Sequence, residues 1–172
     1  MVDKKADLKD LEYELQILLG ASLIIDQLEV ERKLRDGNIV NYFKDSAYIH
    51  IRNLYEFFLS DPKKTNDSKV SAFTNHKFNL SFYLLWREPL NRHVLHIAPG
   101  RNNPNNVKNG KHLKDQIPSF AKNIEDLWTE WIRATADDQL KQKLENTLAD
   151  AKRHAQNDCD KLLGEIDKGA DE

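Results

Sequence analysis

The residues best suited to chemistry in this chain are histidines and arginines placed among apolar residues. They concentrate in two segments, residues 48–58 and 91–101. Removing an imidazole or a guanidinium from water costs free energy unless the group finds a hydrogen-bond or charge partner. We therefore expect the two segments to pair with each other or to line one site. The candidate residues in and near them are His50, Arg52, Asn53, Arg87, His93, His96 and Arg101.

Histidine and arginine together suit the cleavage of RNA without a metal ion. An imidazole titrates near neutral pH and can move protons at a ribose 2′-hydroxyl or a leaving oxygen, while the planar guanidinium can hold the phosphate. Arg87 and His93 are separated by the five residues 88–92, and His96 follows one helical turn after Arg92. These spacings make Arg87, His93 and His96 the candidate catalytic residues.

His50 is expected to be buried. On a helix with about 100° between residues it lies in the centre of an apolar stripe. The other residues of that stripe are Phe43, Ala47, Leu54 and Phe57. Arg52 falls roughly opposite, beside further apolar and aromatic side chains, so this helix has two apolar faces. Such a helix is either central in the bundle or half covered by a second subunit.

The order of a long helix pair, the segment around His50 and the run from Arg87 to Arg101 resembles the HEPN superfamily (higher eukaryote and prokaryote nucleotide-binding), particularly its abortive-infection-like bacterial branch. The likeness spans residues 7–131. It implies a helical-bundle homodimer that acts as a metal-independent endoribonuclease, with an arginine and a histidine a few residues beyond it at the dimer interface. Arg87 and His93 satisfy that spacing, although Glu88 stands where the family usually has Asn, Asp or His.

The resemblance further implies a role in bacterial defence or in a toxin–antitoxin pair. RNA would then be the substrate or ligand, a second copy and a protein antitoxin would be partners, and no cofactor would be needed. His50, Arg52, Asn53 and Arg101 would form the supporting shell of the site. Asn53 follows Arg52 as in the family pattern, but no histidine stands at the required distance beyond it.

Two other functions remain open. The same residues could form a buried hydrogen-bond network that fixes helix register in a non-catalytic interaction protein. Alternatively, His50, His93 and His96 could bind zinc or nickel in a metal-dependent hydrolase, since neutral imidazole is a common ligand for both. No carboxylate shares their stripe in the sequence pattern, and a facing arginine would repel a cation, so no metal ligand is assigned.

A basic run offers a candidate phosphate-binding surface. Residues 101–122 carry several cations against Asp115 alone. The candidate phosphate-binding residues are Lys108, Lys111 and Lys114. Their attraction for phosphate would weaken as salt rises. The alternative is an ordinary solvated loop.

Composition limits the remaining possibilities. At 172 residues and 40% hydrophobic, the chain suits one domain that can bury its own core, and its formal charge of −2 excludes a globally basic nucleic-acid binder. The single Cys159 cannot form an internal disulfide, and residues 1–5 lack the apolar stretch of an export signal. No apolar run is long enough to span a bilayer. These features predict a cytoplasmic protein with no membrane partner.

The spacing of apolar residues predicts an all-α bundle of about five helices, without a strand or an internal repeat. Residues 79–86 are compatible with either a helix or an extended segment, and Pro89 suits the first turn of a short helix. The last helix carries a narrow apolar seam that could pack within the subunit or against a second copy. The expected elements are helices over 3–35, 38–60, 88–98, 118–135 and 137–168, a loop over 61–78 with one turn near 70–73, and an Asn/Gly-rich loop over 101–117.

Overall fold

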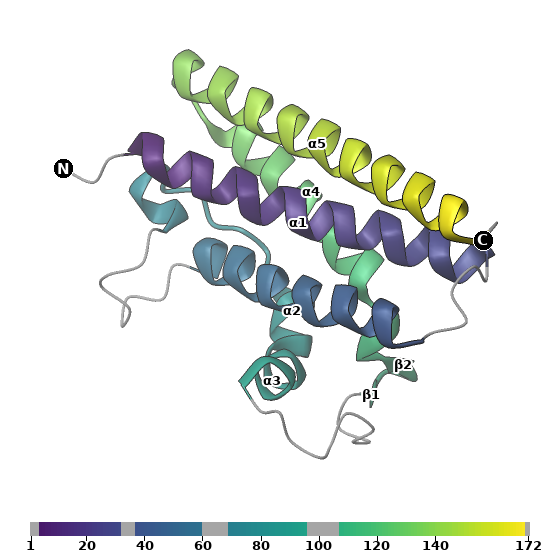
Figure 1. Ribbon diagram of the computed structural model, residues 1–172. Coiled ribbons are helices and arrows are strands. Elements are labelled where there is room, and N and C mark those ends of the chain that lie inside the picture. The colour runs from purple at the N-terminus through teal and green to yellow at the C-terminus, as the bar shows by residue number, and fades with distance from the viewer. Residues whose placement is uncertain (1–3, 32–36, 60–68, 96–106, 171–172) are drawn as a thin grey trace.

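The protein is an all-α bundle, as the sequence predicts (Figure 1). The computed structural model describes residues 4–31, 37–59, 69–95 and 107–170, with side chains described for 8–27, 40–59, 69–92 and 107–165. The helices are α1 (Lys4–Glu31), α2 (Gly37–Leu59), α3 (Ser81–Leu95), α4 (Ile117–Ala134) and α5 (Asp138–Ala170). Short elements are the 3-10 turns η1 (Val70–Ala72) and η3 (Leu113–Asp115) and the strands β1 (Val107–Lys108) and β2 (Lys111–His112).

Helix α2 occupies a central position, with α1 on one side and α3 on the other (Figure 1). It also contacts α4. Buried residues on opposite sides of α2, such as Tyr48 and Phe57, account for its two apolar faces. The first of the two predicted arrangements, a central helix, is therefore confirmed, as is the antiparallel pairing of the two long N-terminal helices.

The apolar seam of α5 packs on α1 of the same chain, and the two helices run in the same direction (Figure 1). The two helices meet at small residues with room for one methyl group, since a Cβ atom added to Gly20 would lie at an ordinary contact distance of 3.7 Å from the Cα atom of Ala155. Cys159 is fully buried beside Ile24 in the same seam. Between the two arrangements left open by the sequence, the structure shows the intrachain one.

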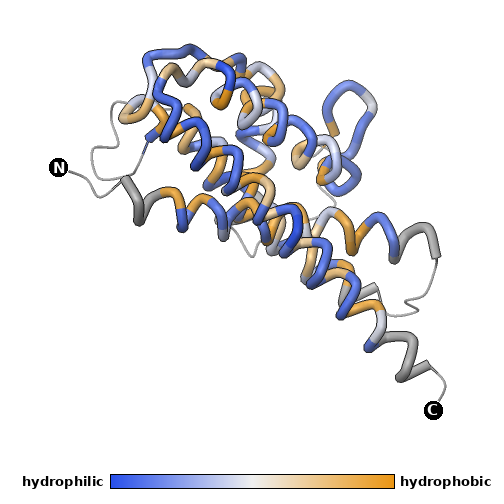
Figure 2. The backbone as a smooth tube through the Cα atoms, turned by 90° about the horizontal axis from the view of Figure 1, so that it is seen from above, coloured by the Kyte–Doolittle hydropathy of each residue, from blue (hydrophilic) through white to orange (hydrophobic). Residues whose placement is uncertain are grey.

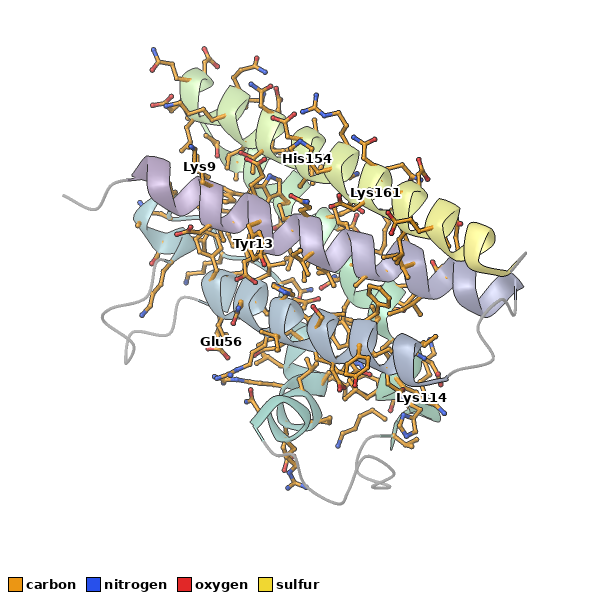
Figure 3. The ribbon with its side chains drawn as sticks, in the orientation of Figure 1. Lys9, Tyr13, Glu56, Lys114, His154 and Lys161 are labelled. Carbon is orange, nitrogen blue, oxygen red and sulfur yellow. The ribbon has the colours of Figure 1, made fainter. Side chains whose placement is uncertain are left out.

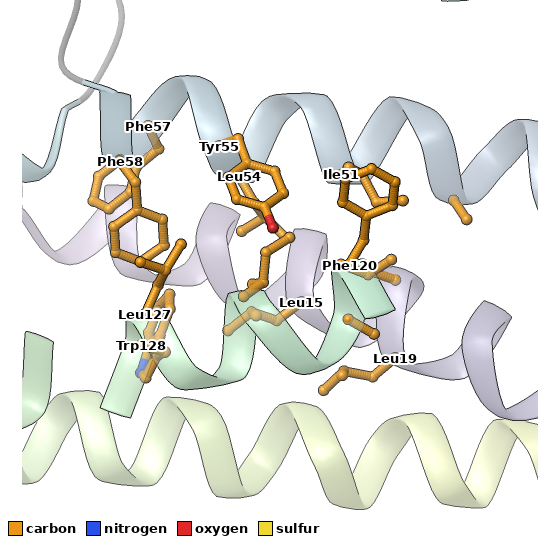
Figure 4. Close-up of a cluster of buried hydrophobic side chains, with 14 of the residues drawn as sticks. Leu15, Leu19, Ile51, Leu54, Tyr55, Phe57, Phe58, Phe120, Leu127 and Trp128 are labelled. Carbon is orange, nitrogen blue, oxygen red and sulfur yellow. The ribbon is translucent and has the colours of Figure 1, made fainter. Parts of the chain in front are cut away.

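An aromatic cluster fills the centre of the bundle between α1, α2 and α4 (Figure 4). Trp128 and Trp131 of α4 are both buried, with ring centroids 5.2 Å apart, and the Trp128 indole N–H donates to the backbone oxygen of Leu144 at 3.0 Å. Hydrophobic and hydrophilic residues alternate along the helices (Figure 2), which is the pattern of amphipathic helices around a shared core. These tryptophans therefore belong to the core.

The third helix begins earlier than predicted. It starts at Ser81, not at residue 88, and Pro89 lies in its interior. Asn79 caps its start, because the Asn79 side-chain oxygen accepts from the backbone N–H of Ser81 at 3.1 Å. Interior proline costs about 3 kcal/mol in an exposed helix. Here Trp86 and Leu90, buried on either side of Pro89, anchor the helix on the bundle and offset that cost.

The basic loop is also more ordered than predicted. Within it, Val107 pairs with His112 and Lys108 with Lys111 in a short antiparallel hairpin. The turn is Asn109-Gly110, with φ angles of 52° and 75°. Asn-Gly is the preferred sequence for a two-residue turn with both φ angles positive. That dipeptide was the signal that the sequence analysis missed.

The remaining boundaries agree with prediction where the structure describes them. The turn near residues 70–73 is η1, and α4 and α5 begin within a residue of their predicted starts. Asp137 caps α5, because its side chain accepts from the backbone N–H of Leu140 at 2.9 Å. The predictions for 60–68 and 96–106 lie outside the described residues. Among the described helices, none combines the length and apolar character needed to cross a bilayer.

Candidate functional site

Arg87 lies where α3 packs against α2. Its guanidinium is 3.3 Å from a carboxylate oxygen of Glu56, and the hydroxyl of Tyr83 donates to the same oxygen at 2.8 Å. The Arg87 side chain is 36% exposed, whereas that of Glu56 is 13% exposed. Figure 3 shows Glu56 on the side of α2 that faces α3. We call these three residues, Glu56, Tyr83 and Arg87, the α2–α3 junction. It presents a guanidinium at the surface, paired with a half-buried carboxylate.

The junction is anchored to the core by two stacked tyrosines. The rings of Tyr55 and Tyr83 are nearly parallel with centroids 4.5 Å apart, and the Tyr55 hydroxyl donates to the side-chain oxygen of Asn123 on α4 at 2.6 Å. Burial raises the pKa of both tyrosines, and the adjacent Glu56 carboxylate raises that of Tyr83 further. Both hydroxyls are therefore neutral donors at physiological pH. The chain of contacts fixes α3, and with it Arg87, on the bundle.

Two buried polar atoms lie one helical turn from the junction. Arg52 precedes Glu56 by four residues on α2, and Asn91 follows Arg87 by four residues on α3, so each shares a helix face with a junction residue. The Arg52 Nε atom and the Asn91 Oδ1 atom are buried without a hydrogen-bond partner in the described part of the chain. The predicted supporting residue Arg52 is therefore on the same face of α2 as Glu56.

His50 and Asn53 contact a different carboxylate. The His50 Nδ1 atom is 2.7 Å from Glu14 on α1, and the Asn53 side-chain N–H₂ donates to both oxygens of Glu14 at 3.1 and 3.2 Å. The ring of Tyr13 meets that of His50 edge-on at 5.9 Å. The His50 side chain is 13% exposed, close to the predicted burial. His50 and Glu56 point to different sides of α2, so the predicted set divides between the α1 side and the α3 side.

The structure describes the candidate catalytic residues only in part. The backbone of α3 is helical through His93, which therefore lies six residues, or about one and a half turns, beyond Arg87 on the same helix. Arg92, next to His93, forms an ion pair with Glu88 one turn earlier. His96 and Arg101 lie outside the described residues.

The candidate phosphate-binding lysines are on and after the hairpin. Lys108, Lys111 and Lys114 form no ion pair with a carboxylate of the described residues. Lys114, labelled in Figure 3, lies in η3, and η3 contacts α3. The side chain of His112 accepts from the backbone N–H of Lys114 at 3.3 Å and so caps this turn. Lys114 and Arg87 thus belong to elements that contact each other, and Lys108 and Lys111 are in the hairpin just before η3.

Sequence reasoning missed the acidic partners Glu14 and Glu56. The available signal was a carboxylate inside each apolar run: Glu56 stands between Tyr55 and Phe57, a position where an unpaired charge would be costly. No group of three histidine, cysteine or acidic side chains that could hold a metal ion is present among the described residues. Comparisons of this chain with protein families, with curated proteins and with solved structures found no match.

Proposed function

We propose that the protein is a HEPN-like RNA-binding protein, acting as a metal-independent endoribonuclease in bacterial defence or in a toxin–antitoxin pair. Arg87 binds a phosphate of the RNA, and His93, on the same helix, transfers protons during cleavage. Two copies of the chain bring two such helices together. The RNA phosphates next to the cleaved bond contact the lysines of the hairpin.

The single observation that carries the proposal is the arrangement of Arg87. The Arg87 side chain is partly exposed, and its guanidinium contacts the more deeply buried Glu56 carboxylate. That carboxylate also accepts from Tyr83, which stacks on Tyr55. A guanidinium fixed in this way loses little side-chain entropy on binding a phosphate. Its remaining N–H groups can donate to two phosphate oxygens at once. The negative charge of Glu56 does not cancel all the positive charge at the α2–α3 junction, because Arg52 lies on the same face of α2 and adds a second cation beside Arg87.

A second candidate is a non-catalytic interaction protein. It is favoured by the paired state of both His50 and Arg87, each of which contacts a glutamate on a neighbouring helix. Such pairs fix the register of α2 against α1 and α3. Under this hypothesis, variants at these positions lower the melting temperature and change no activity.

The experiment is an RNA cleavage assay in EDTA with purified protein and single-stranded RNA. Arg87→Ala and His93→Ala are compared with matched controls on α5, Arg153→Ala and His154→Ala, whose native side chains are 63% and 40% exposed. The proposal expects cleavage by the native protein and by both controls, and a loss of at least about 100-fold for the two test variants. Absence of cleavage by the native protein, or equal activity in all four variants, contradicts the endoribonuclease and favours the second candidate.

A further inference from the structure

A cavity of about 460 Å³ lies next to the α2–α3 junction. It is formed by the end of α2, the region around η1 and the first turns of α3. Phe78 provides a half-buried aromatic wall, and the buried ring of Phe58 packs behind it with the two centroids 5.1 Å apart. Leu80, just before α3, and Leu84 of α3 also line the cavity. Its size is in the range of small-molecule sites.

The cavity is also lined by polar groups close in sequence to Phe78. Asn75 and Lys77 line it, and both side chains are exposed. An amide offers a donor and an acceptor to the edge of a base, and an ammonium attracts phosphate. His76, also in the lining, is hydrogen-bonded to Glu130, with its Nε2 atom 2.6 Å from a carboxylate oxygen.

The position of the cavity relative to Arg87 follows from the register of α2 against α3. Glu56 of α2 contacts Arg87, while Leu59 of α2 and Leu84 of α3 line the cavity. Leu84 precedes Arg87 by three residues, which places them about 4.5 Å apart along the helix axis. Leu84 is 53% exposed, so it stands at the rim between the cavity and the guanidinium.

We infer that this cavity binds one unstacked nucleobase of the RNA whose phosphate contacts Arg87. The inference rests on the proposed function and adds to it the place where the protein reads a base. The base packs against Phe78, its edge meets Asn75, and its 5′-phosphate reaches Arg87 at the rim. Stacking on aromatic side chains with hydrogen bonding at the base edge is the usual way in which proteins bind single-stranded RNA.

Two neighbouring leucines provide a matched pair of variants. Leu84 lines the cavity, whereas Leu85 is 41% exposed and does not line it. Leu84→Trp would fill the rim of the cavity, and Leu85→Trp adds the same bulk to the same helix elsewhere. Because both native side chains are exposed, both variants should fold, which their melting temperatures verify. Asn75→Ala gives a second variant that removes polar atoms without adding bulk.

The measurement is titration calorimetry with the four nucleoside 5′-monophosphates and with the corresponding nucleosides. The inference expects saturable binding that Leu84→Trp weakens by about tenfold or more, as loss of one base stack would. Leu85→Trp should leave it unchanged, and Asn75→Ala should weaken it while changing the preference among the four bases. Arg87→Ala should weaken binding of the nucleotides but not of the nucleosides.

The outcomes separate this inference from the proposed function. If RNA cleavage depends on Arg87 and His93 while Leu84→Trp and Leu85→Trp bind nucleotides and cleave RNA equally, the base-binding cavity is wrong and the proposed function stands. If nucleotides bind in a Leu84-dependent way while the protein neither binds nor cleaves RNA, the proposed function fails and the cavity's role in RNA binding fails with it. The inference is supported only when Leu84→Trp lowers both nucleotide affinity and RNA cleavage.

Discussion

Tyr55 of α2 and Tyr83 of α3 stack with their ring planes 5° apart, and their hydroxyls donate to different elements. The Tyr55 hydroxyl reaches Asn123 on α4, and the Tyr83 hydroxyl reaches Glu56 on α2. This single stack therefore connects the core of the bundle to the carboxylate that holds Arg87. A change at either ring is expected to act on both the stability of the fold and the position of the guanidinium.

Tyr83→Phe should destabilise the protein by about 1 to 2 kcal/mol, because it keeps the stack but leaves the half-buried Glu56 with one donor fewer. Chemical denaturation monitored by circular dichroism measures the loss. Tyr42→Phe is the control, since Tyr42 is 75% exposed and its change should have little effect. Equal stability of the two variants would show that the hydroxyl contact contributes nothing.

The same tyrosines should make stability fall in alkaline solution. Burial raises the pKa of Tyr55 and Tyr83 above the ordinary value of 10.0, so the folded protein holds these protons more tightly than the unfolded chain does. Their contribution is therefore fully present below pH 10.0 and is lost as the pH rises above it. Melting temperatures measured across this range should fall steeply for the native protein.

The double variant Tyr55→Phe/Tyr83→Phe provides the comparison for that pH series. It lacks both buried phenols, so its stability should fall less steeply above the ordinary tyrosine pKa, although it starts from a lower value. Identical slopes for the two proteins would mean that the buried phenols do not govern the alkaline transition.

Glu14 and His50 should be energetically coupled across the α1–α2 interface. A double-mutant cycle with Glu14→Ala and His50→Ala is expected to give a coupling of about 1 kcal/mol, because the two side chains are only 22% and 13% exposed and lie 2.7 Å apart. The exposed pair Asp150 and Arg153 on α5 should give a smaller value in the same measurement. A coupling no larger than that of the control pair would remove the case for a structural role of His50.

Gly20→Ala should stabilise the protein by about 0.5 to 1 kcal/mol, since glycine in a helix interior is less favourable than alanine. The added Cβ would meet Ala155 at ordinary van der Waals distances of 3.7 and 3.8 Å. Gly164→Ala is the control, because a Cβ there meets nothing within 4 Å and can gain only through helix propensity. A loss of stability for Gly20→Ala alone would mean that α1 and α5 need the glycine for closer contact.

The bundle could be predicted well from the sequence, because each long amphipathic helix shows apolar residues three and four positions apart. The boundaries of α4 and α5 followed from Pro118 and Asp137, which are local cap signals. The start of α3 could not be predicted, because Pro89 reads as a helix start unless the burial of Trp86 and Leu90 around it is known. That burial arises from tertiary packing.

The site was predictable only in part for a similar reason. Periodicity placed His50 on a buried stripe, but it could not identify Glu14 on another helix as its partner. Nor could it show that His50 and Arg87 lie on different sides of α2, since that depends on where α1 and α3 pack. Helix faces can be read from the sequence, whereas the pairing of faces cannot.

The central claim, that Arg87 at the α2–α3 junction binds an RNA phosphate, is tested most directly by binding without cleavage. Fluorescence anisotropy with a labelled 2′-O-methyl oligonucleotide measures affinity for the native protein, Arg87→Ala and the α5 control Arg153→Ala. Arg87→Ala should weaken binding by about tenfold and reduce its salt dependence by about one phosphate contact, while Arg153→Ala matches the native protein. Equal affinities and salt slopes for Arg87→Ala and Arg153→Ala would contradict the claim.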